Sequence, residues 1–418
     1  MTSYHHIVSM IRERINAGIY KPGEKIPSVR EIAVEFDCNK LTVQRAFELL
    51  KDEGLLENII GSGSFVRFPE VRDTSHVLYD FRTASLSDTF LPSDTIQSIM
   101  QSLTNKSHTL FGQSTPEGDE ALRVTLGKRY GFPPNRILII SGAQQGLDIT
   151  AKALDLHGDE MVFEDPTYPG ALSLFKPRHF MPLGNNGPDT EILSRHVNNG
   201  IRLIYTMPFI HSPTGTTYSS EVKKTIATMV RAHGLYIIED DYLSDLQPAA
   251  QLRFADIIPE RTIFIKSLSK VTAPGLRIGF MVVPDDLYNR FIDAKFLSDI
   301  ASPPLIQAIT RQFLDDPAFD THIALLRKIS SERRVVIEKL LKQYAYLTTA
   351  PTQQGYSLWI HSKKDITILN APWTPGARFS FNPEHRAFFR LSFMNMNDTI
   401  FKQGYDYLKS IFDRMEVV

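Results

Sequence analysis

The chain has 418 residues, of which 42% are hydrophobic and 22% charged, and its formal net charge is −1. This composition is typical of a protein that buries sizeable cores, and the length predicts one large domain with a smaller partner. No stretch approaches the roughly 20 apolar residues of a membrane-spanning helix, and the start MTSYHHIVSMIRERINAG lacks the features of a secretory signal. The single cysteine, Cys38, excludes an internal disulfide, so we expect a protein of the reducing cytoplasm.

The near-zero net charge gives no general attraction to nucleic acid or to an anionic membrane, so any DNA binding must come from a local surface. The clearest change in texture lies at FPEVRDTSHVLYD, which separates two differently patterned regions. We therefore predict a first domain over residues 1–68, a linker over 69–80 and a second domain over 81–418.

The first domain has the pattern of three helices followed by two strands. Apolar residues near helical spacing predict a first helix over about residues 4–17. In KPGEKIPSVREIAVEF a Pro/Gly turn precedes a second helix, with Ser28 as N-cap and Glu31 placed to complete a capping box. LTVQRAFELLKDEGL predicts a third, amphipathic helix, and ENIIGSGSFVRF predicts two short strands around a Gly-Ser turn.

Polar and basic side chains gather at the start of the third helix. In helix-turn-helix proteins the second helix of the motif lies in the major groove, where its first residues reach base edges and phosphates. The residues in this region are Asn39, Lys40, Thr42, Gln44 and Arg45. The alternative is that they are ordinary solvent-facing residues of an amphipathic helix.

The order of a helix, PGEKIPSVREIA, CNKLTVQRAFELL and GSGSFV resembles the winged helix-turn-helix domain of the GntR family over nearly its whole length. The resemblance implies that Arg30, Lys40, Arg45 and the wing around Gly63 face double-stranded DNA. Glycines at 61 and 63 suit a wing that approaches the phosphate backbone, because no Cβ obstructs the approach. A purely structural turn is the alternative at these glycines.

The second domain alternates helical stretches with short apolar strands, which predicts an α/β fold with a mostly parallel sheet. The expected strands are RILII, EMVFED, IRLIYTM, GLYIIED, RTIFIKS and GFMVVP. The ordered segments SGAQQG, EDPTYPG, SPTG, IIEDDYLSDL, SLSKVTAPGLRIGF and RLSF resemble the fold-type-I pyridoxal-phosphate enzymes, aminotransferases in particular, across roughly residues 80–415. The resemblance implies pyridoxal 5′-phosphate as cofactor and a smaller C-terminal subdomain.

A strand that runs through a glycine turn into a helix offers free amides and a positive helix end to a phosphate. Gly142, Ala143 and Gln144 occupy that turn. Alone, such a turn is usually no more than a turn. In SLSKVTAPGLR, Lys270 offers an amine for a Schiff base, and by the resemblance Ser267, Ser269 and Arg277 hold the phosphate.

The remaining cofactor contacts come from three other segments. Asp240, at the end of GLYIIED, is placed to keep the cofactor's pyridinium nitrogen protonated, and Tyr242 would contact the phenolic oxygen. Tyr168 in EDPTYPG resembles the residue that stacks on the cofactor ring. Arg390 in FRLSF matches the arginine that binds a carboxylate of the amino compound, although a surface salt bridge is the alternative.

Three positions depart from the family pattern. The motif SPTG has Ser212, preceded by His211, where aminotransferases usually have asparagine. Phe111 stands where the family often has a tyrosine that reaches the phosphate across the dimer, and it has no hydroxyl. Gln354 precedes Gly355 in a loop that often carries paired glycines. These departures bring control of the reaction into question.

The fusion of the two domains resembles the MocR subgroup of GntR-type regulators, in which the aminotransferase-like part senses pyridoxal phosphate or an amino compound that reacts with it. We therefore expect a homodimeric transcription regulator with little or no turnover, of vitamin B6 or amino-acid genes, and neither metal nor membrane partner. A working aminotransferase and a scaffold that binds DNA without cofactor are the alternatives.

Overall fold

The computed structural model describes the chain at residues 4–16, 19–20, 24–52, 55–59, 63–66, 79–104, 109–350, 355–366 and 371–417. The chain divides into two compact units, one comprising Met1–His76 with Ser380–Arg386 and the other Val77–Phe379 with Ala387–Val418. Most of the expected linker, residues 69–78, lies outside the described residues, as do Gly61 and Gln354.

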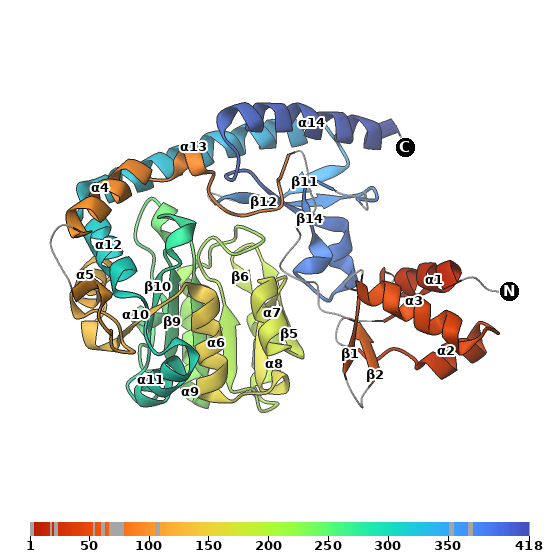
Figure 1. Cartoon of the computed structure of the whole chain (residues 1–418), viewed down its shortest axis with the longest axis horizontal. Helices are drawn as coiled ribbons and strands as arrows, with labels where there is room; N and C mark the ends of the chain where they lie inside the picture. Colours follow the sequence, from red (N-terminus) through yellow and green to blue (C-terminus); the bar gives the residue numbers. More distant parts are fainter. Residues whose placement is uncertain are drawn as a thin grey trace. The chain divides into compact units, whose positions relative to one another are not determined.

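The first unit consists of three helices and a two-stranded antiparallel sheet, as the sequence predicts (Figure 1). The helices are α1 (Tyr4–Asn16), α2 (Val29–Glu35) and α3 (Lys40–Asp52), and the strands are β1 (Leu56–Ile59) and β2 (Gly63–Val66). Ser28 caps α2 in a complete capping box: its Oγ accepts from Glu31 N at 3.3 Å, and Glu31 Oε2 accepts from Ser28 N at 2.7 Å. This cap was expected from the sequence and is confirmed.

Apolar side chains from every helix and both strands form the core of the first unit. Helix α3 presents Val43, Ala46 and Leu50 to this core at helical spacing, and each is fully buried. The other buried members are Ile7, Val8, Ile11, Ile26, Ile32, Ala33, Phe47, Leu56 and Val66. The remaining face of α3 is thereby left for contacts outside the unit.

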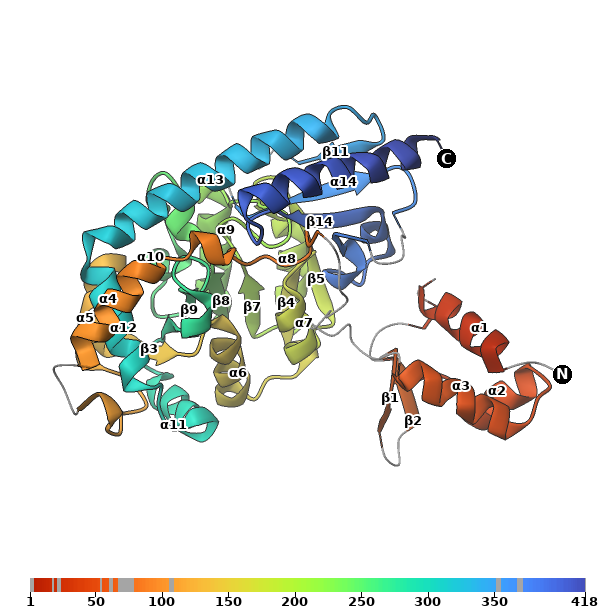
Figure 2. The same ribbon diagram turned by 45° about the horizontal axis from the view of Figure 1, so that its top comes forward.

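Eight strands form the main sheet of the second unit, in the order β3-β10-β9-β8-β7-β4-β5-β6 (Figures 1 and 2). Their bounds are β3 (Ile137–Ile140), β4 (Met161–Asp165), β5 (His179–Gly184), β6 (Gly187–Pro188), β7 (Leu203–Thr206), β8 (Tyr236–Asp241), β9 (Thr262–Ser267) and β10 (Gly279–Val282). Strands β5, β4, β7, β8 and β9 run parallel, whereas β10 pairs antiparallel with β9 and β3. The expected α/β fold with a mostly parallel sheet is confirmed.

Helices cover this sheet and extend beyond it. They are α4 (Ser93–Thr104), α5 (Glu120–Tyr130), α6 (Ala143–Leu154), α7 (Pro169–Phe175), α8 (Thr190–Val197), α9 (Ser220–His233), α10 (Phe254–Ile257), α11 (Tyr288–Asp299), α12 (Pro304–Asp315), α13 (Pro317–Leu341) and α14 (Asp398–Val417). In Figure 1, α6 and α11 lie in front of the sheet, and α6 contacts β3, β9 and β10. Among the described residues, no helix is both long enough and apolar enough to cross a membrane.

A smaller antiparallel sheet forms the C-terminal part of the second unit, as expected. Its strands are β11 (Leu347–Thr349), β12 (Ser357–Ser362), β13 (Thr374–Pro375) and β14 (Phe388–Ser392), in the order β11-β12-β14-β13. Figures 1 and 2 show α13 and α14 running side by side along this sheet. The ring of Trp373 packs on Phe389 of β14 and Phe412 of α14, at 4.6 and 5.8 Å between centroids, which joins helix and sheet in one core.

Candidate functional site

The carboxylate of Asp240 marks the centre of the candidate site. Asp240 lies in β8, is buried, and accepts a hydrogen bond at its Oδ2 from the hydroxyl of Tyr205 at 2.7 Å. Its other oxygen, Oδ1, is buried and has no hydrogen-bond partner among the described residues. Burial is the main reason that the pKa of Asp240 rises to about 7. A hydrogen-bond donor placed against Oδ1 would stabilise the charged form of this buried carboxylate.

Gly142, Ser269 and Arg277 meet at the N-terminus of α6. Gly142 has φ +89° and ψ 169°, a conformation essentially restricted to glycine, and directly precedes the helix. A Cβ built at Gly142 would lie 3.3 Å from Nη2 of Arg277 and 3.8 Å from Oγ of Ser269. The Ser269 hydroxyl is buried without a hydrogen-bond partner among the residues that the structure describes. Ala143 and Gln144 are the first two residues of α6, so this cradle combines a helix end, a hydroxyl and a guanidinium.

Ser267 borders the cradle, and among the residues that the structure describes its side chain has no hydrogen bond that would show a role. It ends β9 and pairs with Gly279 of β10. A Cβ at Gly279 would lie 3.4 Å from Cα of Gly142, so the two strands bring Ser267 and the phosphate turn into the same neighbourhood.

Lys270 follows β9 and is enclosed by the site. Its Nζ donates to the carbonyl of Ala84, and its own carbonyl accepts from the hydroxyl of Tyr356 at 2.8 Å. Burial, reinforced by the positive charges of Arg390 and Arg277, lowers the pKa of Lys270 to about 8. The neutral, nucleophilic form of this amine is therefore more accessible near neutral pH than that of an exposed lysine.

Two tyrosines lie close to these groups. Tyr168 is the N-cap residue of α7, and its hydroxyl donates to Oε1 of Gln144 at 3.1 Å. Burial raises the pKa of Tyr168, and the charges of Asp240, Arg277 and Arg390 also act on it. Tyr242 follows β8. Burial raises the pKa of Tyr242, whereas the positive charge of Arg390 and a hydrogen bond from Ser212 lower it. The structure thus brings Tyr168, Asp240, Tyr242, Lys270, Arg277 and Arg390 together.

Arg390 reaches the site from the smaller sheet. It lies in β14, its Nη2 donates to the carbonyl of Arg82 at 2.7 Å, and its guanidinium lies 4.8 Å from the ring centroid of Phe379. Burial lowers the pKa of Arg390 to about 10. Its Nε is buried and has no hydrogen-bond partner within the described part of the chain. Such a guanidinium is suited to a carboxylate, as the resemblance implies, and the alternative of a surface salt bridge does not describe its setting.

The unpartnered polar atoms fit pyridoxal phosphate. Oδ1 of Asp240 can accept from a protonated ring nitrogen, and Oγ of Ser269, beside Arg277 and the start of α6, can donate to a phosphate. The amine of Lys270 is desolvated in the way that covalent attachment to an aldehyde requires. Leaving such groups buried without partners costs free energy, which a bound cofactor would recover.

Sequence reasoning missed the contacts that surround these groups. The hydroxyl of Tyr205 binds Asp240, but a buried strand tyrosine has the same pattern with or without such a bond. Glu164 was detectable, because a carboxylate inside the apolar strand MVFED requires buried partners. Its Oε1 accepts from Thr206 Oγ1 at 3.0 Å, and its Oε2 lies 3.2 Å from Nε2 of His211. This places His211, beside Ser212, in a buried polar cluster.

The expected DNA-contacting residues lie on the exposed surface of the first unit. Lys40, Gln44 and Arg45 of α3 and Arg30 of α2 are exposed, whereas Thr42 is half-buried. The guanidinium of Arg45 lies 4.7 Å from the ring centroid of Tyr4, which restrains it.

Two other expected contacts have local structural roles. The side chain of Asn39 accepts from Leu41 N at 3.0 Å, which explains why α3 begins at Lys40, one residue before the expected start. Gly63 has φ +119°, and a Cβ there would lie 2.8 Å from Cε of Lys25. The glycine therefore allows Lys25 to lie against the wing.

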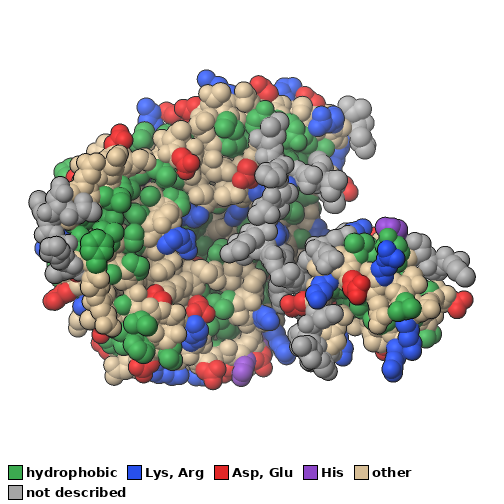
Figure 3. Space-filling view, viewed as in Figure 1, with side chains coloured by type: hydrophobic (Ala, Val, Ile, Leu, Met, Phe, Trp, Pro, Cys, Tyr) green, Lys and Arg blue, Asp and Glu red, His purple; other side chains and the backbone are tan. Residues whose placement is uncertain are grey.

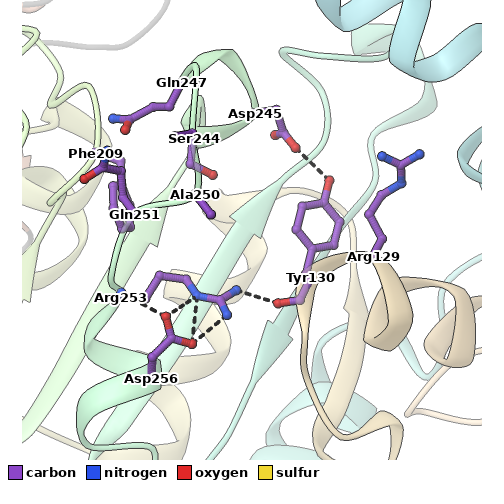
Figure 4. A pocket seen from close by; sticks show the side chains of 11 residues that line it. Arg129, Tyr130, Phe209, Ser244, Asp245, Gln247, Ala250, Gln251, Arg253 and Asp256 are labelled. Carbon is purple, nitrogen blue, oxygen red and sulfur yellow. Dashed lines mark hydrogen bonds and ion pairs between the residues drawn. The ribbon is translucent and has the colours of Figure 1, made fainter.

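A separate cavity of about 270 Å³ lies near Asp245 and Arg253 (Figure 4). The hydroxyl of Tyr130 donates to Asp245 at 2.9 Å, and Arg253 forms an ion pair with Asp256 at 2.6 Å. Arg129 is paired with Asp320 at 2.8 Å. These charged side chains are already paired with one another inside the protein. The cavity is therefore a weaker candidate for a charged ligand than the cofactor site.

Fold and site together define a class of protein: a fold-type-I aminotransferase-like unit joined to a winged helix-turn-helix unit. The chain belongs to the aminotransferase class I and II family, whose model matches residues 84–403, and residues 3–66 match the gntR family of bacterial regulatory proteins. This combination is that of the MocR subgroup of GntR-type transcription regulators.

Two relatives match over most of the chain. The HTH-type transcriptional regulator YisV of Bacillus subtilis is 27% identical over 413 residues, covering 87% of this chain and 85% of its own. The HTH-type transcriptional regulator NorG of Staphylococcus aureus is 26% identical over 392 residues, covering 82% and 88%.

Solved aminotransferases share the fold of the second unit. LysN, an α-aminoadipate aminotransferase of Thermus thermophilus, superposes with a TM-score of 0.74 at 23% identity, covering 81% of this chain and 92% of its own. An archaeal alanine:glyoxylate aminotransferase gives a TM-score of 0.75 at 19% identity, covering 89% and 94%. At these identities the likeness establishes the fold, and the site must be argued from this chain's own residues.

Proposed function

We propose that this regulator binds operator DNA through its winged helix-turn-helix unit, and that its aminotransferase-like unit binds pyridoxal phosphate and senses the cofactor or its adduct with an amino compound. One observation carries the proposal: Oδ1 of Asp240 and Oγ of Ser269, both buried without hydrogen-bond partners among the described residues, belong to the same site as the buried amine of Lys270. A degenerate scaffold would have no reason to retain these costly groups.

Bound pyridoxal phosphate supplies an aldehyde that condenses with amines and a ring that accepts electrons. Asp240 would hold the ring nitrogen by a charge-assisted hydrogen bond, and Tyr242 the phenolic oxygen. Arg277, Ser267, Ser269 and the amides of Gly142, Ala143 and Gln144 would hold the phosphate. Tyr168 would lie against the ring, and Lys270 would attach the aldehyde.

Arg390 would select the amino compound. Its buried guanidinium can bind a carboxylate with two parallel hydrogen bonds, so an amino acid is the expected class of effector. Ser212 differs from the asparagine expected there, and its hydroxyl bonds to Tyr242. The phenolic end of the cofactor would therefore be held by Tyr242 without the amide that aminotransferases usually place there.

We further propose that the regulator is a homodimer. Figure 3 shows apolar side chains gathered on the second unit over α4 and α12. Phe111 is 74% exposed, and Phe296, Leu297 and Ile300 at the end of α11 are also exposed. A second copy that covered these side chains would remove apolar surface from water, and a two-fold dimer would bind two operator half-sites.

The competing function is a working aminotransferase. The presence of Asp240, Tyr242, Lys270, Arg277 and Arg390 in one site favours it. Sustained production of keto acid from an amino acid, at a rate unaffected by DNA, would support this alternative.

Genome-wide mapping of DNA bound by the full chain, with and without added pyridoxal phosphate, tests the proposed function. We expect a small set of promoters whose occupancy changes with the cofactor. The Lys270→Ala variant should bind promoters without that response. Binding that is absent, or identical under both conditions, would contradict the sensor proposal.

A further inference from the structure

Tyr205 lies beside the candidate cofactor site, but the sequence did not predict it as a site residue. It lies in β7, next to β8, and its side chain is fully buried. Its ring stacks on Phe163 of β4, with 4.7 Å between centroids and 19° between planes. Packing therefore leaves the ring little freedom, and its hydroxyl points at one target, Oδ2 of Asp240, at 2.7 Å.

The two oxygens of Asp240 are used differently. Oδ2 accepts from Tyr205, while Oδ1 is buried and has no hydrogen-bond partner in the described residues. Because the rotation of a carboxylate is fixed once one oxygen is held, the bond to Tyr205 decides where Oδ1 points. A tyrosine held by ring stacking is a stiffer support than a water or a flexible side chain.

We propose that Tyr205 is a positioning residue, which orients the carboxylate of Asp240 and keeps it ionised so that Oδ1 is presented to the ring nitrogen of pyridoxal phosphate. This inference rests on the proposed cofactor binding. A neutral carboxylic acid could not pair with a protonated ring nitrogen, so the charge of Asp240 matters as much as its direction.

The groups around Asp240 make the hydrogen bond from Tyr205 important. Asp241 of β8 and Glu164 of β4 raise the pKa of Asp240 by repulsion, and burial raises it most. Lys266 of β9 lowers it, but that amine is also paired with Asp241, at 3.0 Å. Tyr168 faces the carboxylate from α7. The bond from Tyr205 is the largest influence that opposes burial.

The test uses the full chain with Tyr205→Phe, which keeps the stacked ring and removes the donor. We expect the dissociation constant of pyridoxal phosphate to rise about tenfold or more, since hydrogen bonds to charged groups contribute about 1.5–3 kcal/mol. Cofactor binding should weaken as pH falls through the pKa of Asp240, because the carboxylate is then neutral. In Tyr205→Phe this weakening should begin at higher pH. Titrations from pH 6 to 9, followed by visible absorbance, measure both effects.

Tyr344→Phe is the matched control. Tyr344 is also buried, and its hydroxyl donates to a carboxylate, Oδ1 of Asp413, at 2.6 Å, on elements outside the site. It should leave cofactor affinity and its pH dependence unchanged. If Tyr205→Phe does not fold, 3-fluorotyrosine in place of Tyr205 is a stronger donor of nearly the same shape, and should move the acid limb to lower pH.

The outcomes separate this inference from the function on which it rests. A wild-type chain that binds no cofactor contradicts the proposed function. A wild-type chain that binds it, beside a folded Tyr205→Phe variant with the same affinity and the same pH profile, overturns the role of Tyr205 alone. An equal loss in Tyr344→Phe would also overturn it, because the effect would then be one of general stability.

Discussion

A lowered pKa does not by itself identify the lysine that binds a cofactor, as a comparison of Lys270 with Lys223 shows. Burial lowers the pKa of both amines. Nζ of Lys223 donates to the carbonyl of Leu252 and lies 3.9 Å from the ring centroid of Phe209, whereas the charges of Arg277 and Arg390 act on Lys270. Reactivity toward an aldehyde that carries a phosphate requires positively charged groups near the amine, as at Lys270.

We therefore expect borohydride to fix pyridoxal phosphate covalently on Lys270, because reduction traps the bond between the amine and the aldehyde. Peptide mapping of the reduced full chain locates the adduct. The Lys270→Ala variant should lose at least 90% of the label. Label on Lys223, or on no lysine of a cofactor-loaded sample, would show that Lys270 has been wrongly assigned.

Arg45 is the base-contact candidate with the best-defined side chain, because the ring of Tyr4 restrains it on the exposed face of α3. Arg45→Ala should weaken operator binding by about 1–3 kcal/mol if the guanidinium reads a base. Gel-shift titration of the full chain measures this. Lys51→Ala, at the other end of α3, is the control and should have a much smaller effect. Equal losses in the two variants would reduce Arg45 to a general electrostatic contribution.

At the scale of elements, the sequence predicted those helix caps and strands that depend on neighbouring residues in the chain. The capping box of Ser28, the strand that contains Asp240 and the strand that precedes Lys270 were all visible in the sequence. Strand β5 was not, because Met181 is its one fully buried residue and Pro182 interrupts it, so no apolar run marks it. The bond between Arg390 and the carbonyl of Arg82 joins positions 308 residues apart, and a backbone acceptor leaves no signature in a sequence.

The phosphate turn offers a test of an element as a whole. Gly142→Ala should weaken cofactor binding about tenfold, because its backbone conformation is essentially restricted to glycine and a Cβ would lie 3.3 Å from Arg277. Equilibrium binding of pyridoxal phosphate measures the effect. Gly234→Ala is the control, since Gly234 has φ +66° in open space among the described residues and should cost about 1 kcal/mol of stability without changing affinity. Equal affinity in both variants would contradict a role for the turn.

The cap of α2 determines how well the helix that carries Arg30 is held. Ser28→Ala should cost about 1 kcal/mol locally, which corresponds to roughly fivefold faster hydrogen exchange of the amides of α2. Ser28→Asp keeps an acceptor at the cap and should retain protection. Exchange measured by mass spectrometry on the full chain compares the two. Unchanged exchange in Ser28→Ala would show that packing, and not the cap, holds α2.

At the scale of the whole molecule, the chain combines a unit built to bind DNA with a unit built to bind a small molecule. A ligand shifts DNA affinity only by the difference in its own affinity for two arrangements of the protein. Lys270 follows a strand of the large sheet and Arg390 lies in the small sheet, so an amino compound bound to both would bridge the two parts of the second unit. Such bridging can favour one arrangement over another.

Operator affinity should therefore differ between the apo protein, the protein loaded with pyridoxal phosphate, and the protein loaded with cofactor and a candidate amino acid. Coupling of about 1–3 kcal/mol would change the affinity roughly 5- to 150-fold. Fluorescence anisotropy with one operator duplex at one salt concentration provides the three titrations, because DNA affinity depends steeply on salt. Arg390→Lys should keep the response to the cofactor and lose the further response to the amino acid, since lysine lacks the two-pronged geometry. If the three curves coincide while the amino acid is converted to keto acid over many cycles, the protein is an aminotransferase, and the sensor proposal fails.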